Sequence, residues 1–345
     1  MLAKNLKYYR LKNNMSKKDL AEAIGVSAMA ITNYENGSRN PNMETLKRLA
    51  TALNVRVTDF LASTGSALQF SHGKFRKGSK LSLTDQEYIR ESVEEYFSRF
   101  FQVVDALGGT DVLGSIPTTR KIPWTENAEK AAENLRKYLN ISEDGPIDRL
   151  VETLENKGVL VLFLSVESRF FSGMNGTVNG IPYIVINSSM SPARIRSTIV
   201  HEVAHFAIDW PDDLDEKSEE AIATAISGAF LFPRHDAYRE LGYKRNFVSR
   251  DMTITCREYG ISLFMLAKRA RLCNIITESA ERAFYIRASK IGWRANEPNW
   301  GIEKEEPGLF KQLVFRAVTE DEISIQKGAE LLGCSYDSVV KSCFI

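Results

Sequence analysis

The sequence has few cysteines, few histidines and no long apolar run. The cysteines lie far apart and form no Cys-x-x-Cys pair, which argues against a thiolate zinc site or a disulfide framework: Cys256, Cys273, Cys334 and Cys343. No stretch of eighteen apolar residues and no basic-then-apolar leader occurs, so we expect neither membrane insertion nor secretion. These absences predict a cytoplasmic protein with reduced thiols and no membrane partner.

Charge is distributed unevenly along the 345 residues. Residues 1–62 contain ten Lys and Arg against five Asp and Glu, a net charge of +5, so the remaining residues carry −4 of the overall +1. A small basic module attached to a mildly acidic body indicates one part that meets phosphate groups and another that does not.

Periodicity and turn signals divide the chain into four parts. We expect an all-α five-helix domain at 1–62, a linker and helical connector at 63–127, an α+β domain at 128–290 and a helical C-terminal region at 291–345. The linker itself covers the Ser-, Gly- and Lys-rich residues 63–82. An apolar run from Val159 and the hairpin-forming pair Asn179-Gly180 predict a small antiparallel sheet at 159–187.

The first domain contains a helix-turn-helix candidate. Two short helices, capped by Ser16 and Ser27, are joined by a tight turn at Gly25. Their apolar residues predict a shared core, which leaves the opposite face of the second helix exposed. The residues expected to face the DNA major groove are Ser27, Ala28, Met29, Thr32 and Asn33.

Three basic residues flank this face and are placed to contact phosphate: Lys17, Lys18 and Arg39. Phosphate contacts position a protein on DNA without specifying a sequence. The alternative is a five-helix interaction domain whose basic face is only solvated. The charge of +5 favours binding to double-stranded DNA.

The stretch TIVHEVAHFAID at 198–209 carries the strongest chemical signal. Residues four apart on a helix share a face, so His201 and His205 can present both imidazoles to one ion. Glu202 is turned by about 100° from His201, an offset that suits a general base beside the metal. The alternative is a buried helix whose polar residues are satisfied by neighbours, but burying such groups without partners is costly, which favours a shared ion.

A catalytic zinc site takes a third protein ligand, which the acidic stretch at 212–220 can supply. Glu220 shares a helical stripe with small residues that would let its helix pack against the histidine helix, whereas Glu219 lies beside isoleucines. We therefore prefer Glu220 over Glu219. The alternative is that both only stabilise a helix N-terminus.

Two family resemblances follow from these motifs. FFSGMNGTVNGIPYIVIN, RIRSTIVHEVAHF and EAIATAISGAFLFP, in this order, resemble the ImmA/IrrE metallopeptidase family over about residues 128–290. The resemblance implies a zincin-like α+β fold with metal ligands His201, His205 and Glu220 and with Glu202 as the catalytic base. The family often has Asn at the position of Thr224.

The second resemblance covers nearly all of residues 4–62. The stretch from Met15 to Val55 is similar to the Cro/C1-type (XRE) helix-turn-helix family, which often has Gln at the position of Lys17. Such domains usually read DNA half-sites as dimers, so a homodimer is implied. The chain is thus expected to be multidomain: an all-α helix-turn-helix domain, then an α+β zincin-like metallopeptidase with a small antiparallel sheet, then a helical tail.

These observations favour a DNA-binding transcriptional regulator with zinc-dependent endopeptidase activity. Its substrate would be a repressor or other regulatory protein, with its own N-terminal module as an intramolecular candidate, and Mn²⁺ is an alternative to Zn²⁺. His235 and Tyr238 are the candidates for an oxyanion donor, or else ordinary surface residues. Two other functions stay open: a regulator whose zincin-like domain senses metal or peptide without turnover, and an antitoxin-type DNA-binding partner protein.

Overall fold

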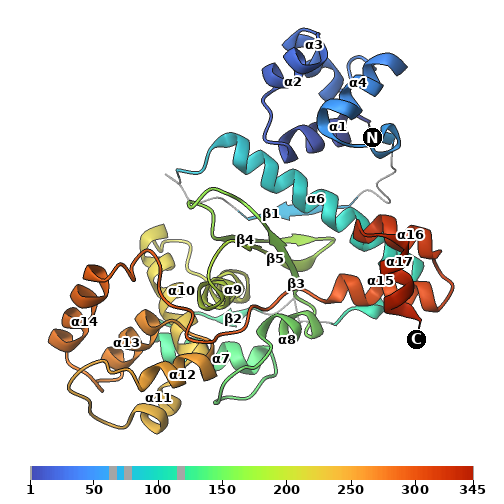
Figure 1. Cartoon of the computed structure of the whole chain (residues 1–345). Helices are drawn as coiled ribbons and strands as arrows, with labels where there is room; N and C mark the ends of the chain where they lie inside the picture. The colour runs from blue at the N-terminus through green and yellow to red at the C-terminus, as the bar shows by residue number, and fades with distance from the viewer. Residues whose placement is uncertain (1, 62–67, 74–79, 115–120, 345) are drawn as a thin grey trace. The chain divides into compact units, whose positions relative to one another are not determined.

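The structure is a computed structural model that describes residues 2–61, 68–73, 80–114 and 121–344. Figure 1 shows its helices and strands, coloured from the N-terminus to the C-terminus. The chain divides into two compact units. The helical unit consists of Met1–Phe70, Phe75–Val112 and Phe310–Ile345, and the α+β unit consists of Ser71–Lys74 and Leu113–Leu309. The four-part division expected from the sequence stays a prediction, because the two units reflect spatial packing rather than chain order.

The helical unit begins with five short helices, as predicted. They are α1 (Leu2–Lys12), α2 (Lys17–Ile24), α3 (Ala28–Glu35), α4 (Met43–Leu53) and α5 (Val57–Leu61). Side chains of Ser16, Ser27 and Asn42 cap α2, α3 and α4 by accepting backbone N–H groups that would otherwise have no helical partner. The leucines and aromatic residues between the helices are buried, so these helices enclose their own hydrophobic core.

The rest of the helical unit is also helical. It contains α6 (Leu83–Ala106), which lies within the expected helical connector, the 3-10 turn η1 (Thr110–Val112), and the C-terminal helices α15 (Leu309–Thr319), α16 (Ile325–Leu332) and α17 (Tyr336–Cys343). The predicted helical C-terminal region is therefore confirmed. Among the described helices of the whole chain, none has the length and hydropathy that crossing a bilayer requires.

The α+β unit is built on a four-stranded sheet. Its strands, in spatial order, are β1 (Phe70–His72), β4 (Gly173–Val178), β5 (Ile181–Asn187) and β3 (Leu160–Leu164). The hairpin between β4 and β5 is confirmed: it is antiparallel, and Asn179 and Gly180 have φ of 50° and 81°, as a type I′ turn requires.

The sheet differs from the prediction in two respects. It is mixed rather than antiparallel, because β3 pairs with β5 in parallel. The chain crosses from β3 to β4 and leaves a place between these two strands. The hairpin then brings β5 back into that place, where it runs in the same direction as β3. Second, β1 lies within the predicted linker at 63–82, of which 63–67 and 74–79 fall outside the described residues. A strand of three residues is too short to show a periodicity from which it could be predicted.

The α+β unit also contains helices. They are α7 (Ala128–Tyr138), α8 (Leu150–Asn156), α9 (Pro192–Ala207), α10 (Glu216–Leu231), α11 (Arg234–Leu241), α12 (Met252–Tyr259), α13 (Leu263–Leu272) and α14 (Glu278–Lys290). Of these, α9 and α8 contact the sheet. Two short strands, β2 (Ile122–Pro123) and β6 (Ile208–Asp209), pair in parallel. Helix α9 packs against β4, β5 and α10, so it is covered on several sides.

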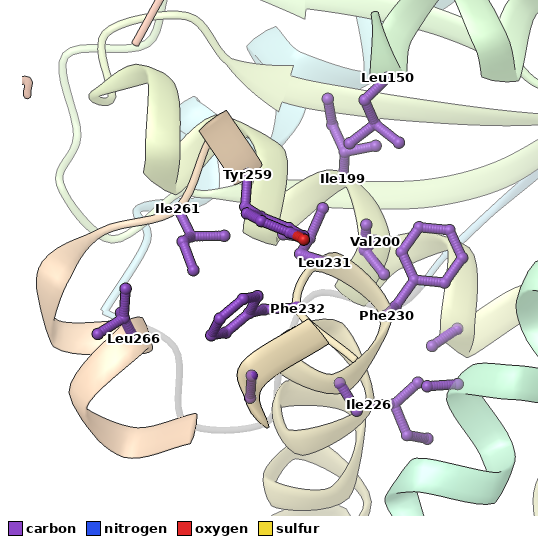
Figure 2. Close-up of a cluster of buried hydrophobic side chains, with 14 of the residues drawn as sticks. Leu150, Ile199, Val200, Ile226, Phe230, Leu231, Phe232, Tyr259, Ile261 and Leu266 are labelled. Carbon is purple, nitrogen blue, oxygen red and sulfur yellow. The ribbon is translucent and has the colours of Figure 1, made fainter. Parts of the chain in front are cut away.

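Figure 2 shows the hydrophobic core that results. Ile199 and Val200 of α9 and Phe230 of α10 are fully buried together with Tyr259 of α12 and Leu266 of α13. Helix α9, which carries the His-Glu-x-x-His motif, is therefore fixed by core packing on both sides of the motif.

Candidate metal centre and DNA-binding face

Helix α9 is held firmly at its start. Pro192 occupies its first position, where a missing N–H costs nothing. Arg196 is buried and donates hydrogen bonds to the carbonyls of Ile147 and Asp148, at 2.5 and 3.2 Å, and it pairs with Glu305. The motif one turn later thus projects from a backbone with little freedom to move.

Three side chains converge as a metal site requires. The Nε2 atoms of His201 and His205 lie 3.1 Å apart, and the carboxylate oxygens of Glu220 lie 3.2 Å from the first and 3.5 Å from the second. Four ligands around zinc, with bonds of about 2.0–2.1 Å, are separated by about 3.3 Å. The separations therefore match one tetrahedral ion, and both imidazoles and a carboxylate are ligand types that zinc accepts.

The two histidine rings are also held from behind. Nδ1 of His205 lies 2.8 Å from Oε1 of Glu219, and Nδ1 of His201 lies 3.4 Å from the hydroxyl of Thr224, which itself donates to the carbonyl of Glu220 at 2.8 Å. A carboxylate or hydroxyl behind a ligating imidazole fixes its tautomer and leaves Nε2 for the metal. Glu219, the weaker candidate for third ligand, thus contacts a ligand, and Thr224 fills the position where the resembling family often has Asn.

Glu202 lies beside this group on α9 and is held by a residue that sequence reasoning missed. Asn175 of β4 donates from Nδ2 to Oε2 of Glu202 at 2.8 Å, and Glu202 is only 7% exposed. The sequence signal is weak, because one Asn in a Gly-Met-Asn-Gly stretch has many explanations. Trp210 was also missed: the centroid of its ring lies 5.7 Å from the centroid of the His205 ring.

The electrostatics of the site favour a cation. Burial by itself would lower the pKa of His205, but the hydrogen bond to Glu220 and the negative charges of Glu202 and Glu220 outweigh it, so the pKa is raised. Carboxylates thus dominate the field at the imidazole. A divalent ion that replaces the proton would meet the same field.

The two oxyanion candidates make their contacts away from the histidines. The hydroxyl of Tyr238 donates to the carbonyl of Cys273 at 3.0 Å. His235 is exposed, and its Nδ1 lies 3.8 Å from a carboxylate oxygen of Asp144. Both side chains belong to α11, and the structure does not bring either of them into contact with His201, His205 or Glu220.

The helix-turn-helix pair has the exposed face that its sequence predicts. Gly25 ends α2 in the left-handed conformation with φ of 70°, and Ser27 starts α3 two residues later. Ile31 and Tyr34 point into the core, whereas Met29 is 67% exposed. The other predicted groove residues lie on the same outer side: Ser27 and Ala28 are exposed, and Thr32 and Asn33 are half-buried.

The predicted phosphate contacts are accessible in different degrees. Lys18 and Arg39 are exposed, and Lys18 forms a long pair with Glu22 at 3.8 Å. Lys17 is half-buried and lies 3.7 Å from Glu35. Glu35 is itself clamped by Arg10, whose Nε and Nη2 donate to it at 2.5 and 3.1 Å, so Lys17 is part of a structural cluster as well.

Comparison with known proteins agrees with this geometry. Residues 6–60 match the helix-turn-helix family, and residues 154–271 match the IrrE N-terminal-like domain of M78 peptidases. The control protein C.SmaI of Serratia marcescens is 40% identical over 65 residues, which are 19% of this chain and 77% of that protein. The chain belongs to the helix-turn-helix family.

A second relative supports the same assignment. An uncharacterized HTH-type transcriptional regulator of Methanocaldococcus jannaschii is 35% identical over 54 residues, which are 16% of this chain and 82% of that protein. No solved structure matches the chain. This helix-turn-helix protein therefore combines an XRE-type DNA-binding domain with an IrrE-like domain that contains the group of His201, His205 and Glu220.

Proposed function

We propose that this helix-turn-helix protein is a transcriptional regulator that hydrolyses a peptide bond in a repressor or another regulatory protein. The observation that carries the proposal is the convergence of His201, His205 and Glu220 beside the buried carboxylate of Glu202. A site that only sensed metal would need the three ligands but no general base. Cytoplasmic location is part of this proposal.

His201, His205 and Glu220 would hold the metal, which we take to be Zn²⁺, with Mn²⁺ as the alternative. When bound, the ion supplies Lewis acidity that activates water and polarises a carbonyl group. Glu219 and Thr224 keep the two imidazoles oriented through their Nδ1 atoms.

Glu202 moves the proton in this scheme. It accepts a proton from the attacking water, and the oxygen of that water forms a bond to the peptide carbonyl carbon. As the carbon–nitrogen bond breaks, Glu202 passes the proton to the leaving amine, so atoms and charge balance. Asn175 is a positioning residue, because its amide donates to the Glu202 oxygen at 2.8 Å and holds the carboxylate toward the site.

Strand β4 offers a way to hold the substrate. Asn175 places this strand beside Glu202, and an extended peptide added to it would gain main-chain hydrogen bonds while passing the base. The expected substrate is therefore an unfolded or extended segment of a protein. At the other end of the chain, the exposed face of α3 would read a DNA half-site, and a homodimer would read two.

Hydrolysis of fluorescein-labelled casein, an unfolded protein, tests the activity in the presence of Zn²⁺ or Mn²⁺. Glu202→Gln should lower the rate at least about a hundredfold, because a general base contributes that much, while metal and DNA binding stay unchanged. Glu278→Gln, at an exposed position of α14, is the matched control and should retain the wild-type rate. Equal rates for wild type and Glu202→Gln would exclude the peptidase function.

A further inference from the structure

Strand β1 occupies the edge of the sheet that the proposed peptidase would need for its substrate. The order β1-β4-β5-β3 puts β4 next to the edge, and β4 carries Asn175, which donates to Glu202. The opposite edge is β3, two strands away from β4. A peptide that pairs with β4 therefore takes the place that β1 already fills.

The pairing of β1 with β4 is made beside the base. The backbone N–H of Gly73 donates to the carbonyl of Asn175 at 2.8 Å, so the same residue holds the segment through its backbone and Glu202 through its side chain. A Cβ atom at position 73 would lie 2.4 Å from that carbonyl oxygen. Only glycine fits here without movement of the strand.

Tyr183 of β5 and Gly176 of β4 also contact the β1 segment closely. Tyr183 of β5 pairs with Gly176 of β4, and its hydroxyl lies 2.6 Å from Nδ1 of His72. A Cβ at position 176 would meet this hydroxyl at 2.5 Å and the carbonyl of Ser71 at 2.6 Å. The edge of β4 is thus shaped to receive a backbone closely, with a hydrogen-bonding group for one side chain.

The segment reaches this edge from elsewhere in the chain. Ser71 and the following residues belong to the α+β unit, although Phe70 before them and α6 after them belong to the helical unit. Its sequence, Phe-Ser-His-Gly, contains a single apolar side chain, which is too few to form an apolar stripe. Main-chain pairing through Gly73 and the contact of His72 with Tyr183 hold the segment, and contacts of the same kinds hold an extended peptide.

We infer that residues 70–73 act as a built-in pseudosubstrate, which occupies the peptide-binding edge of β4 and must leave before a protein substrate can bind. This inference rests on the proposed function. A tethered segment competes at an effective concentration of about millimolar, so a free peptide at micromolar concentration would be largely excluded. The segment lies in sequence between α5 and α6. Tension on the chain at either end of the segment would therefore separate it from β4 and free the edge of that strand.

The test uses a fluorescein-labelled peptide with the sequence of residues 68–75, LQFSHGKF, and fluorescence polarisation. The full chain carries Glu202→Gln to prevent turnover and is compared with and without Gly73→Pro, which removes the N–H donor to Asn175. We expect the Gly73→Pro chain to bind the peptide at least about tenfold more tightly than the chain with Gly73 intact. Equal affinity, or no binding to either chain, would overturn the inference.

Two further variants guard this result. Leu83→Pro puts a proline at the exposed first position of α6, where it is tolerated, and should bind the peptide as weakly as the wild-type edge does. Gly73→Ala keeps the N–H but forces its Cβ against Asn175, so it should also bind more tightly. Hydrogen exchange at the Gly73 amide should be slow in the wild type; exchange at the rate of a free peptide would contradict the inference.

The outcomes separate the inference from the peptidase proposal. Tighter peptide binding by Gly73→Pro, with no casein hydrolysis by any chain, would support an occupied peptide edge and contradict peptidase activity. Casein hydrolysis at the same rate by wild type and Gly73→Pro, with equal peptide binding, would support peptidase activity and contradict an occupied peptide edge. If both hold, Gly73→Pro should hydrolyse casein at least about tenfold faster than the wild type.

Discussion

The helix-turn-helix region and the metal centre both bury charged groups, but they neutralise them differently. In the former, Glu35 is 8% exposed and accepts two hydrogen bonds from Arg10, an opposite charge fixed within the same fold. In the latter, Glu219 and Glu220 contact the imidazoles of His205 and His201, and Glu202 contacts an amide. A carboxylate paired with arginine is a completed structural contact, whereas carboxylates gathered around imidazoles create a field for a cation.

The two regions also place function differently relative to the core. On α3 the residues that pack, Ile31 and Tyr34, face away from the exposed Met29 that would contact DNA. On α9 the buried Ile199 and Val200 directly precede His201 and Glu202, which are 8% and 7% exposed. Substitutions on the DNA-binding face should therefore change binding without changing stability, while those at the metal centre risk both.

The largest effect should come from breaking the completed ion pair. Glu35→Ala leaves Arg10 buried without its carboxylate and should lower the free energy of unfolding by about 3–5 kcal/mol. Glu22→Ala, which removes an exposed carboxylate of α2, should change it by less than about 1 kcal/mol. Hydrogen exchange in α1 and α3 measures both, and similar protection in the two variants would contradict this view of Arg10 and Glu35.

A buried carboxylate that has no cationic partner in the part of the chain that the structure describes should behave differently with pH. Glu155 accepts hydrogen bonds from the N–H groups of Gly308 and Leu309, but burial dominates and raises its pKa from 4.5 to about 7. The folded state therefore holds the proton of Glu155 more tightly than the unfolded state does. The stabilisation of the folded state by this proton is complete below pH 4.5 and is lost as the pH rises to about 7, which lowers the free energy of unfolding by about 3 kcal/mol.

Glu155→Gln keeps an acceptor oxygen but cannot titrate, so the stability difference from the wild type should vary by about this amount between pH 4.5 and 8. Urea unfolding followed by tryptophan fluorescence measures the α+β unit alone, because it contains all four tryptophans: Trp124, Trp210, Trp293 and Trp300. A constant difference across this range would show that Glu155 is ionised in the folded protein.

Glu219→Ala tests whether a carboxylate behind a ligating histidine strengthens metal binding. It removes the carboxylate behind His205 but no ligand, so zinc affinity should fall by about 10–100-fold. Competition with a fluorescent zinc chelator measures the affinity. Asp213→Ala, which removes an exposed acidic residue of the preceding loop, controls for the loss of one negative charge. Equal affinities in the two variants would mean that Glu219 acts only through its charge.

The smallest effect is expected on the DNA-binding face. Lys18→Ala should leave stability unchanged within about 0.5 kcal/mol. For a short nonspecific DNA duplex, the plot of log affinity against log salt concentration has a negative slope. The variant should make this slope shallower by about 1, because one phosphate contact is lost. Lys47→Ala on α4 is the control, since Lys47 is exposed and lies outside the predicted DNA-binding set. An unchanged slope in Lys18→Ala would remove Lys18 from the phosphate contacts.

Local patterns predicted the elements that local sequence determines. The five N-terminal helices, the Asn179-Gly180 hairpin and the helices that carry His201 and Glu220 all have caps, turns or periodicity of their own. Contacts that depend on distant parts of the chain could not be predicted. The parallel direction of β3, the pairing of β1 and the donation from Asn175 to Glu202 arise only when the sheet has formed.

The different roles of two neighbouring glutamates show the same limit. Both Glu219 and Glu220 face the histidine helix, one toward Nδ1 of His205 and the other toward the two Nε2 atoms. Composition around each residue favoured Glu220 as the ligand, but it gave no reason to place Glu219 behind the same ring. A helical period assigns a residue to a face, and the partner across that face decides what the residue does.

The most direct test of the central claim is the metal content of the purified full-length protein beside its Glu220→Ala variant, measured by mass spectrometry of the elements after incubation with Zn²⁺ and removal of free ions. About one zinc per wild-type chain, lost in the variant, is the result that three converging ligands predict. No stoichiometric metal in the wild type, or equal metal in both proteins, would contradict the assignment of His201, His205 and Glu220 as a metal centre.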